Sequence, residues 1–154
     1  AIVPTKGNTP EGRGLWVSSD DGRLHFSPND GKTWNDLSKN LPGMKEGAWI
    51  PYVEASVHNV AEAWVVVNDF RRGDTRPMVY HTTNYGETFT KVVDENKVVG
   101  HALAIVQDPI EPNLLFLGTD QGLFISFDKG CPLHTSDAAH DLHCLAHGCR
   151  RQLS

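Results

Sequence analysis

A pattern of eight residues recurs along this chain, and its spacing limits the possible folds more than any other feature. The pattern reads Ser/Thr-x-Asn/Asp-x-Gly-x-Thr-aromatic; two copies are complete and a third stops after its glycine. Copies begin at Ser27, Thr82 and Ser126, so intervals of 55 and 44 residues separate them. Such intervals are close to the roughly 40–50 residues of one four-stranded propeller blade. The pattern residues are Ser27, Asn29, Gly31, Thr33 and Trp34, then Thr82, Asn84, Gly86, Thr88 and Phe89, then Ser126, Asp128 and Gly130.

Each position of the pattern suits a tight hairpin turn. The Asn or Asp can bond backbone amides two residues on, and the glycine supplies a positive φ at low steric cost. The first hydroxyl can accept from another turn amide, and the final aromatic residue can fold back over the hairpin. These residues are therefore predicted to be structural, and no catalytic or cofactor-binding residue is predicted among them.

The apolar runs between the turns predict an all-β chain. They are short and rich in β-branched and aromatic residues, and no persuasive helical period occurs before residue 135. The prediction is a partial β-propeller of about three blades, at about residues 12–38, 50–94 and 101–130, each an antiparallel meander. The third blade is expected to lack its fourth strand. Expected strands are residues 15–18, 24–27 and 33–37, then 52–57, 63–68, 78–83 and 89–93, then 102–107, 114–118 and 123–127.

The chain resembles Asp-box (bacterial neuraminidase repeat) propellers, and within them the sortilin-like type. The likeness runs from Tyr52 through Gly86, continues at Asp108-Pro109 and Leu115 to Phe127, and covers most of residues 15–130. The Asp-box alone is shared by sialidases, xyloglucanases, sortilins and a photosystem assembly factor. The resemblance implies large exported bacterial proteins, often labelled glycosyl hydrolases, in which the Asp-boxes lie on the outer rim, away from the central site.

Charge, apolar content and length exclude some partners and imply others. The net charge is −5 with acidic and basic residues interspersed, so no basic stripe for nucleic acid is present. No apolar run approaches the roughly 20 residues of a membrane span. About three blades in 154 residues do not close a ring, and neither an initiating Met nor a signal peptide is visible. We therefore expect a fragment whose partners include the remaining blades of a parent propeller.

Residues 131–154 differ in kind from the rest and are predicted to be a separate tail. They hold all three cysteines and four of the eight histidines, and the repeat stops mid-motif there. A frame slip or junction is favoured over a native domain end. The spacing permits a zinc site, but the favoured interpretation is a solvated tail with a short helix over residues 137–147, without metal. The zinc alternative would use Cys131, His134, His140, His143, Cys144, His147 and Cys149.

One polar cluster has the residue types of a sialidase site. Arginines could clamp a substrate carboxylate, with acidic and tyrosine groups beside them. Because all six residues fall near one strand connection of a single blade, a hydrated, partly salt-bridged loop is the favoured interpretation. Trp16 and Trp64 are predicted core residues, whereas Trp49 is the one tryptophan considered for ligand contact, although packing against the neighbouring blade is favoured. The cluster comprises Asp69, Arg71, Arg72, Asp74, Arg76 and Tyr80.

Two classes of function fit these observations. The preferred one is a non-catalytic scaffold whose loops bind a protein or peptide, as the sortilin-like resemblance implies. The alternative is a fragment of a sialidase-like or xyloglucanase-like glycoside hydrolase, acting on a glycan, with most catalytic residues outside this chain. No cofactor is predicted for either class.

Overall fold

The computed structural model describes residues 1–127, 129 and 134–135, and it consists of three four-stranded antiparallel sheets. Two short 3-10 helices connect strands, η1 (Ser38–Asn40) and η2 (Phe70–Arg72). The first sheet contains β1 (Ile2–Thr9), β2 (Gly12–Ser18), β3 (Leu24–Ser27) and β4 (Asn35–Asp36). The second contains β5 (Trp49–Ala55), β6 (Ala63–Asp69), β7 (Asp74–Thr82) and β8 (Thr90–Lys91). The third contains β9 (Ala102–Gln107), β10 (Leu115–Thr119), β11 (Gly122–Ser126) and β12 (His134–Thr135).

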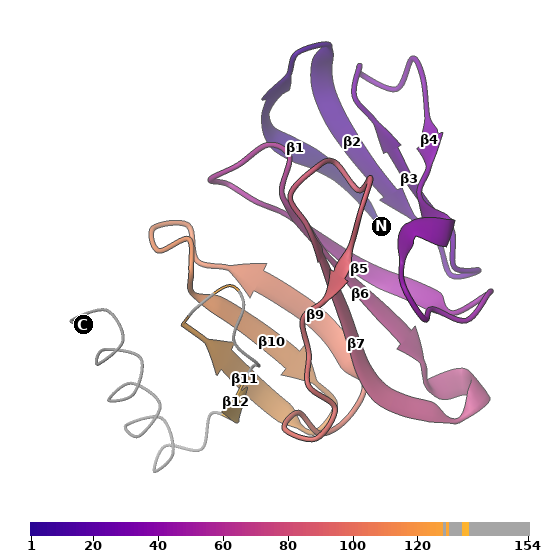
Figure 1. Ribbon diagram of the computed structural model, residues 1–154, viewed down its shortest axis with the longest axis vertical. Helices are drawn as coiled ribbons and strands as arrows, with labels where there is room; N and C mark the ends of the chain where they lie inside the picture. Colours follow the sequence, from indigo (N-terminus) through magenta and orange to yellow (C-terminus); the bar gives the residue numbers. More distant parts are fainter. Residues whose placement is uncertain (128, 130–133, 136–154) are drawn as a thin grey trace.

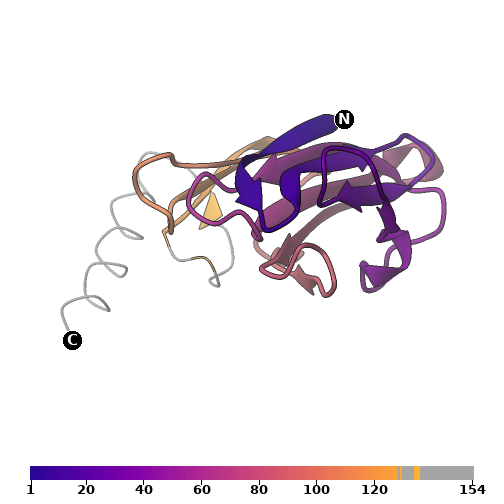
Figure 2. The same cartoon turned by 90° about the horizontal axis from the view of Figure 1, so that it is seen from above.

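Every sheet is a meander in which each strand pairs with the next along the chain. The second sheet lies between the other two, and its first strand, β5, packs against both β1 and β9 (Figure 1). The turned view in Figure 2 shows an array that is wider than it is deep. This is the arrangement of consecutive propeller blades, so the predicted all-β architecture of about three blades is confirmed.

Two strands were missed by sequence reasoning, one at each end of the array. The first blade was expected to start near residue 12 with three strands, but β1 pairs with β2 from Ile2↔Val17 to Thr9↔Gly12. The prediction that the third blade lacks a fourth strand is wrong, because β12 pairs with β11 through Phe124↔Thr135 and Ile125↔His134. Backbone hydrogen bonds define both strands, and neither sequence has the apolar alternation from which a strand is predicted. Apart from His134, the residues of the proposed zinc pattern lie outside the described residues, as do the predicted helix and the pattern residues Asp128 and Gly130.

The first two eight-residue patterns form hairpin turns with the same hydrogen bonds. In the first, the Ser27 Oγ accepts from the Gly31 N–H at 2.9 Å, and the Asn29 Oδ1 accepts from the Thr33 N–H at 2.9 Å. The asparagine therefore bonds four residues on, not two as predicted. The fourth position, Asp30 at φ 58°, joins Gly31 at φ 82° in the left-handed region, which is the mark of a type I′ turn. In the second turn, Gly86 N–H to Thr82 is 3.0 Å, Thr88 N–H to Asn84 is 3.0 Å, and φ is 57° at Tyr85 and 85° at Gly86.

The final aromatic residue behaves differently in the two turns. Phe89 is 8% exposed and belongs to the core between the first and second sheets. Trp34 is 45% exposed, although its ring also lies near the glycine of its own turn. Of these two turns, only the second faces a preceding blade among the described residues, so its aromatic residue is covered and that of the first turn is not.

The core consists of two apolar layers, one on each face of the second sheet. Side chains along β6 point alternately into the two layers: Ala63, Val65 and Val67 face the first sheet, whereas Trp64 and Val66 face the third. All seven residues of β6 are buried, which agrees with the continuous apolar run of its first five residues. The central blade thereby stabilises both neighbours.

Neighbouring blades also meet at equivalent positions of the repeat, which we call junctions. At the first junction, Tyr85, the fourth residue of the second turn, stacks on Phe26 of the first blade with centroids 5.5 Å apart. At the second, Lys129 holds the same position in the third turn, and its Nζ lies 3.0 and 3.1 Å from the two carboxylate oxygens of Glu62. His81, the counterpart of Phe26, contributes Nε2 at 2.8 Å from the same carboxylate. One junction is thus apolar and the other ionic.

Candidate functional site

One end of the blade array gathers the connections between the second and third strands of every blade. The β2–β3, β6–β7 and β10–β11 connections lie there, together with the segments that lead into β5 and β9. Antiparallel pairing requires this, because the second strand of each blade ends where the first strand begins. We call it the loop end; the eight-residue turns lie at the opposite end, the turn end.

At the loop end, three rings form a row, which we call the ring stack, that crosses from the second blade to the third. Trp49 and Phe70 have centroids 6.4 Å apart and are tilted by 56°, and Phe70 stacks on His101 at 4.9 Å with an interplanar angle of 14°. The Arg71 guanidinium carbon lies 5.0 Å from the Trp49 centroid, within cation–π range. The Asp120 Oδ1 lies 3.3 Å from the His101 Nδ1 at the other end of the stack.

The ring stack is open to solvent. Phe70 is 41% exposed and Trp49 is half-buried, so part of each residue's surface is accessible to a ligand. Arg71 is exposed and forms no ion pair within the described part of the chain. The stack therefore offers apolar contact area beside one available positive charge.

The carboxylates of the predicted polar cluster form ion pairs with neighbouring cations. The Asp69 Oδ1 accepts from Arg72 Nε at 2.6 Å, and its Oδ2 is buried without a partner among the described residues. Asp74 accepts from Arg76 at 2.8 and 2.6 Å and from Lys45 at 3.1 Å. The hydrogen bonds from Arg76 hold the pKa of Asp74 well below its usual range, so it stays an anion paired with cations. This is the salt-bridged loop favoured from the sequence.

Tyr80 does not join the cluster. It is 1% exposed, and its hydroxyl donates to the Pro42 carbonyl at 2.8 Å. Burial raises the pKa of this hydroxyl, which keeps it protonated. Trp16 and Trp64 are fully buried, as predicted, and only Trp49 of these three lies where a ligand could reach it.

Sequence reasoning missed His101 and Asp120. Both come from the third blade, and His101 is 52 residues from Trp49, so no local spacing connects them. A usable signal existed, because Trp49 begins the first strand of its blade and His101 immediately precedes the first strand of the next. Aligning the blades would have placed both residues at the same end.

Comparison with known proteins finds similarity at the level of fold. No protein-family model and no curated protein sequence matches the chain. Among solved structures, YCF48 bound to D1 peptide matches with a TM-score of 0.60 and 18% identity, over 79% of this chain and 36% of that chain. An ancestral GH74 enzyme matches with a TM-score of 0.66 and 19% identity, over 90% and 19%. The GH74 xyloglucanase from Xanthomonas campestris gives 0.63 and 19%, over 87% and 20%.

These similar structures are β-propeller proteins. The chain has the fold of a partial β-propeller. It spans about a third of the length of YCF48 and about a fifth of the GH74 enzymes. In the part of the chain that the structure describes, no helix is long and apolar enough to cross a membrane.

Proposed function

We propose that this blade array is a non-catalytic scaffold whose loop end binds an extended peptide or protein segment. The observation that carries the proposal is the exposed ring stack of Trp49, Phe70 and His101, which bridges two blades beside the available Arg71. Aromatic residues and arginine are enriched among the residues that contribute most of the binding energy at protein interfaces. Peptide side chains of acidic or aromatic character fit this chemistry best.

The state of the carboxylates supports binding rather than hydrolysis. Glycosidases need two carboxyl groups that face one substrate, one of them able to donate a proton. Asp69 and Asp74 instead accept hydrogen bonds from Arg72, and from Arg76 and Lys45. Similarity to YCF48 bound to a peptide agrees with this proposal. The Asp-box assignment, the sortilin-like subclass and an exported location, all implied by sequence resemblance, belong to the same proposal.

Glycan recognition is the second candidate, favoured by one observation. The Trp49 ring is partly exposed, and a flat aromatic face can stack on a sugar ring, as expected in a fragment of a xyloglucanase-like enzyme. The structural similarity to GH74 enzymes agrees with this alternative.

A selection experiment separates the two candidates. The whole chain is immobilised and panned with a random dodecapeptide phage library, and the enriched peptides are measured by fluorescence anisotropy against wild type, Trp49→Ala and Phe70→Ala. Trp34→Ala is the matched control, because Trp34 is an exposed tryptophan of the turn end. Xyloglucan heptasaccharide is titrated in parallel by calorimetry.

We expect peptides rich in acidic and aromatic residues, and we expect their binding to weaken at least about tenfold in Trp49→Ala while Trp34→Ala binds like wild type. Heptasaccharide binding that is lost in Trp49→Ala would replace the peptide proposal with the glycan one. Enriched peptides that bind both tryptophan variants equally well would refute a site at the ring stack.

A further inference from the structure

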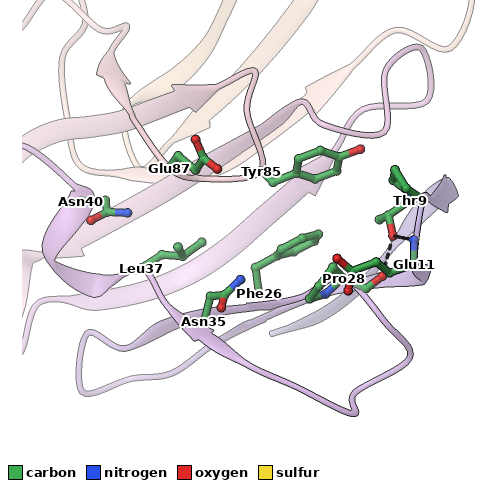
Figure 3. A pocket seen from close by; sticks show the side chains of 10 residues that line it. Thr9, Glu11, Phe26, Pro28, Asn35, Leu37, Asn40, Tyr85 and Glu87 are labelled. Carbon is green, nitrogen blue, oxygen red and sulfur yellow. Dashed lines mark hydrogen bonds between the residues drawn. The ribbon is translucent and has the colours of Figure 1, made fainter.

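A cavity lies at the turn end, where the first and second blades meet. Its volume is about 570 Å³, and its walls come from the β1–β2 turn, β3, the segment from β4 to η1, and the second eight-residue turn. Figure 3 shows Phe26 and Tyr85 in the middle of this cavity, with Leu37 beside them. It is separate from the loop end and takes no part in the proposed function.

The charged groups that line this cavity are all acidic. Among the described residues that line it, Glu11 and Glu87 are the only ones with charged side chains, and Figure 3 shows them on opposite sides of the Phe26 and Tyr85 rings. Both are exposed. The Glu87 carboxylate has no hydrogen-bond or ion-pair partner among the described residues, and the Glu11 carboxylate accepts one long hydrogen bond of 3.4 Å from the Asn29 amide. Two carboxylates with available lone pairs therefore flank an aromatic surface.

The walls are fixed by hydrogen bonds that do not involve these carboxylates. The Thr9 hydroxyl donates to the Pro28 carbonyl at 2.5 Å and accepts from the Glu11 N–H at 3.1 Å, which holds the rim at Glu11. On the other side, the Asn40 amide donates to the Gly86 carbonyl at 2.8 Å and anchors the turn that carries Tyr85 and Glu87. The cavity is therefore preformed, so a ligand loses little free energy in ordering it.

The acidic lining of the first cavity is not shared by the cavity at the second junction. An equivalent cavity of about 400 Å³ lies between the second and third blades. Its charged lining residues are two lysines, Lys91 and Lys129, and one carboxylate, Asp94. His81 occupies the position that Phe26 has in the first cavity. A cation is therefore favoured at the first junction only.

We propose that the first cavity binds arginine or lysine side chains of a basic partner peptide. A guanidinium or ammonium group placed over the Tyr85 ring gains a cation–π contact and is attracted by carboxylates on both sides. Carboxylates on two sides of the rings suit a segment with two nearby cations better than a single small ion. The net charge of −5 favours the approach of such a segment.

The test uses a fluorescein-labelled peptide of six Arg-Ser repeats, titrated with the whole chain and followed by anisotropy. The variant is Glu11→Gln with Glu87→Gln, which retains the side-chain shape and removes both charges. The matched control is Asp20→Asn with Glu46→Gln, which removes two exposed carboxylates at the loop end. Backbone amide NMR shifts locate the binding site, and spermidine is the small-cation arm.

We expect the Glu11/Glu87 variant to bind about tenfold more weakly, because two partly exposed ion pairs are lost, while the control stays within about twofold of wild type. Shift changes should centre on Phe26, Tyr85 and Glu87. An equal loss in the control would show that only net charge attracts the peptide, and would refute the site. If spermidine binds as tightly as the peptide and is weakened equally by the Glu11/Glu87 variant, the ligand of this cavity is a free polyamine and the peptide proposal is wrong.

Discussion

Leu37 of the first blade lies directly against Gly86 of the second, so that a Cβ on Gly86 would stand only 2.4 Å from the Leu37 Cδ1. Gly86 is also held by the Asn40 amide, which donates to its carbonyl. The glycine of this turn is therefore needed for two reasons, its positive φ and the close approach of the neighbouring blade. At Gly31 of the first turn only the first reason applies, because the nearest atom to a Cβ is the Trp34 Cζ2 at 3.5 Å.

Gly86→Ala should therefore destabilise the chain more than Gly31→Ala. We expect about 1 kcal/mol for Gly31→Ala from backbone strain, and about 2–3 kcal/mol for Gly86→Ala from strain plus the clash with Leu37. Urea unfolding followed by tryptophan fluorescence measures both. Glu87→Ala, next to Gly86 but exposed, serves as the control and should change little. Equal losses at Gly31 and Gly86 would show that the contact between the blades contributes nothing.

The aromatic residue that ends each pattern should also differ in importance. Phe89→Ala removes a buried ring from the core and should cost about 3 kcal/mol, whereas Trp34→Ala, at an exposed site, should cost less than about 1 kcal/mol. Urea unfolding followed by tryptophan fluorescence measures both variants. A shift of the emission maximum confirms that the exposed Trp34 has been removed. A large loss in Trp34→Ala would mean that this ring is covered in solution.

The ionic junction should make stability depend on pH. Burial acts to raise the pKa of Glu62, but hydrogen bonds from His81 and Lys129 outweigh it and lower the pKa to about 2. Because the folded value lies below the unfolded one, the stabilisation is fully present above about pH 5 and is lost as pH falls towards 2. At most about 3 kcal/mol is involved.

Glu62→Gln should therefore flatten the fall in stability between pH 5 and 2, and Lys129→Met should reduce it. Asp74, which is also paired, contributes an acid-dependent loss of its own in every variant. The informative quantity is thus the difference between wild type and Glu62→Gln in the free energy of unfolding at each pH. A difference that does not change with pH would contradict the junction described above. Glu111→Gln, at an exposed carboxylate, controls for net charge.

The isolated chain should not hydrolyse glycosides. Its loop-end carboxylates Asp69 and Asp74 are paired with cations, and Tyr80 donates to a backbone carbonyl inside the core. A panel of fluorogenic sialosides and xyloglucan oligosaccharides, assayed from pH 4 to 8, checks this. Turnover that disappears in Arg76→Ala would promote the hydrolase alternative.

The hairpins were predictable because their information is local. Asn29 and Gly31, and equally Asn84 and Gly86, specify their turn within a few residues, and the predicted pairing of β3 with β4 and of β7 with β8 is confirmed. Strand β1 was not predictable, because its residues are mostly exposed and include Pro4 and Gly7. It is held by its backbone pairing with β2, which no side-chain pattern records.

The candidate site was predictable only within one blade. The arginines and aspartates around η2 lie close together along the chain, so their mutual ion pairs follow from sequence proximity. The ring stack depends on how the second and third blades pack, and that geometry brings Phe70 onto His101. The junctions were missed for the same reason: Tyr85 and Lys129 occupy a variable position of the pattern, and their partners lie on another blade.

The different chemistry of the two junctions limits how such a gene could be rearranged. If unequal recombination removed the second blade, the ammonium of Lys129 would meet the ring of Phe26, and Gly14 would stand where Glu62 now supplies a carboxylate. If the second blade were duplicated, Tyr85 of the new copy would face the His81 ring and the Glu62 carboxylate. Either product would have a mismatched boundary, so the residues at the junctions permit only one order of these three blades.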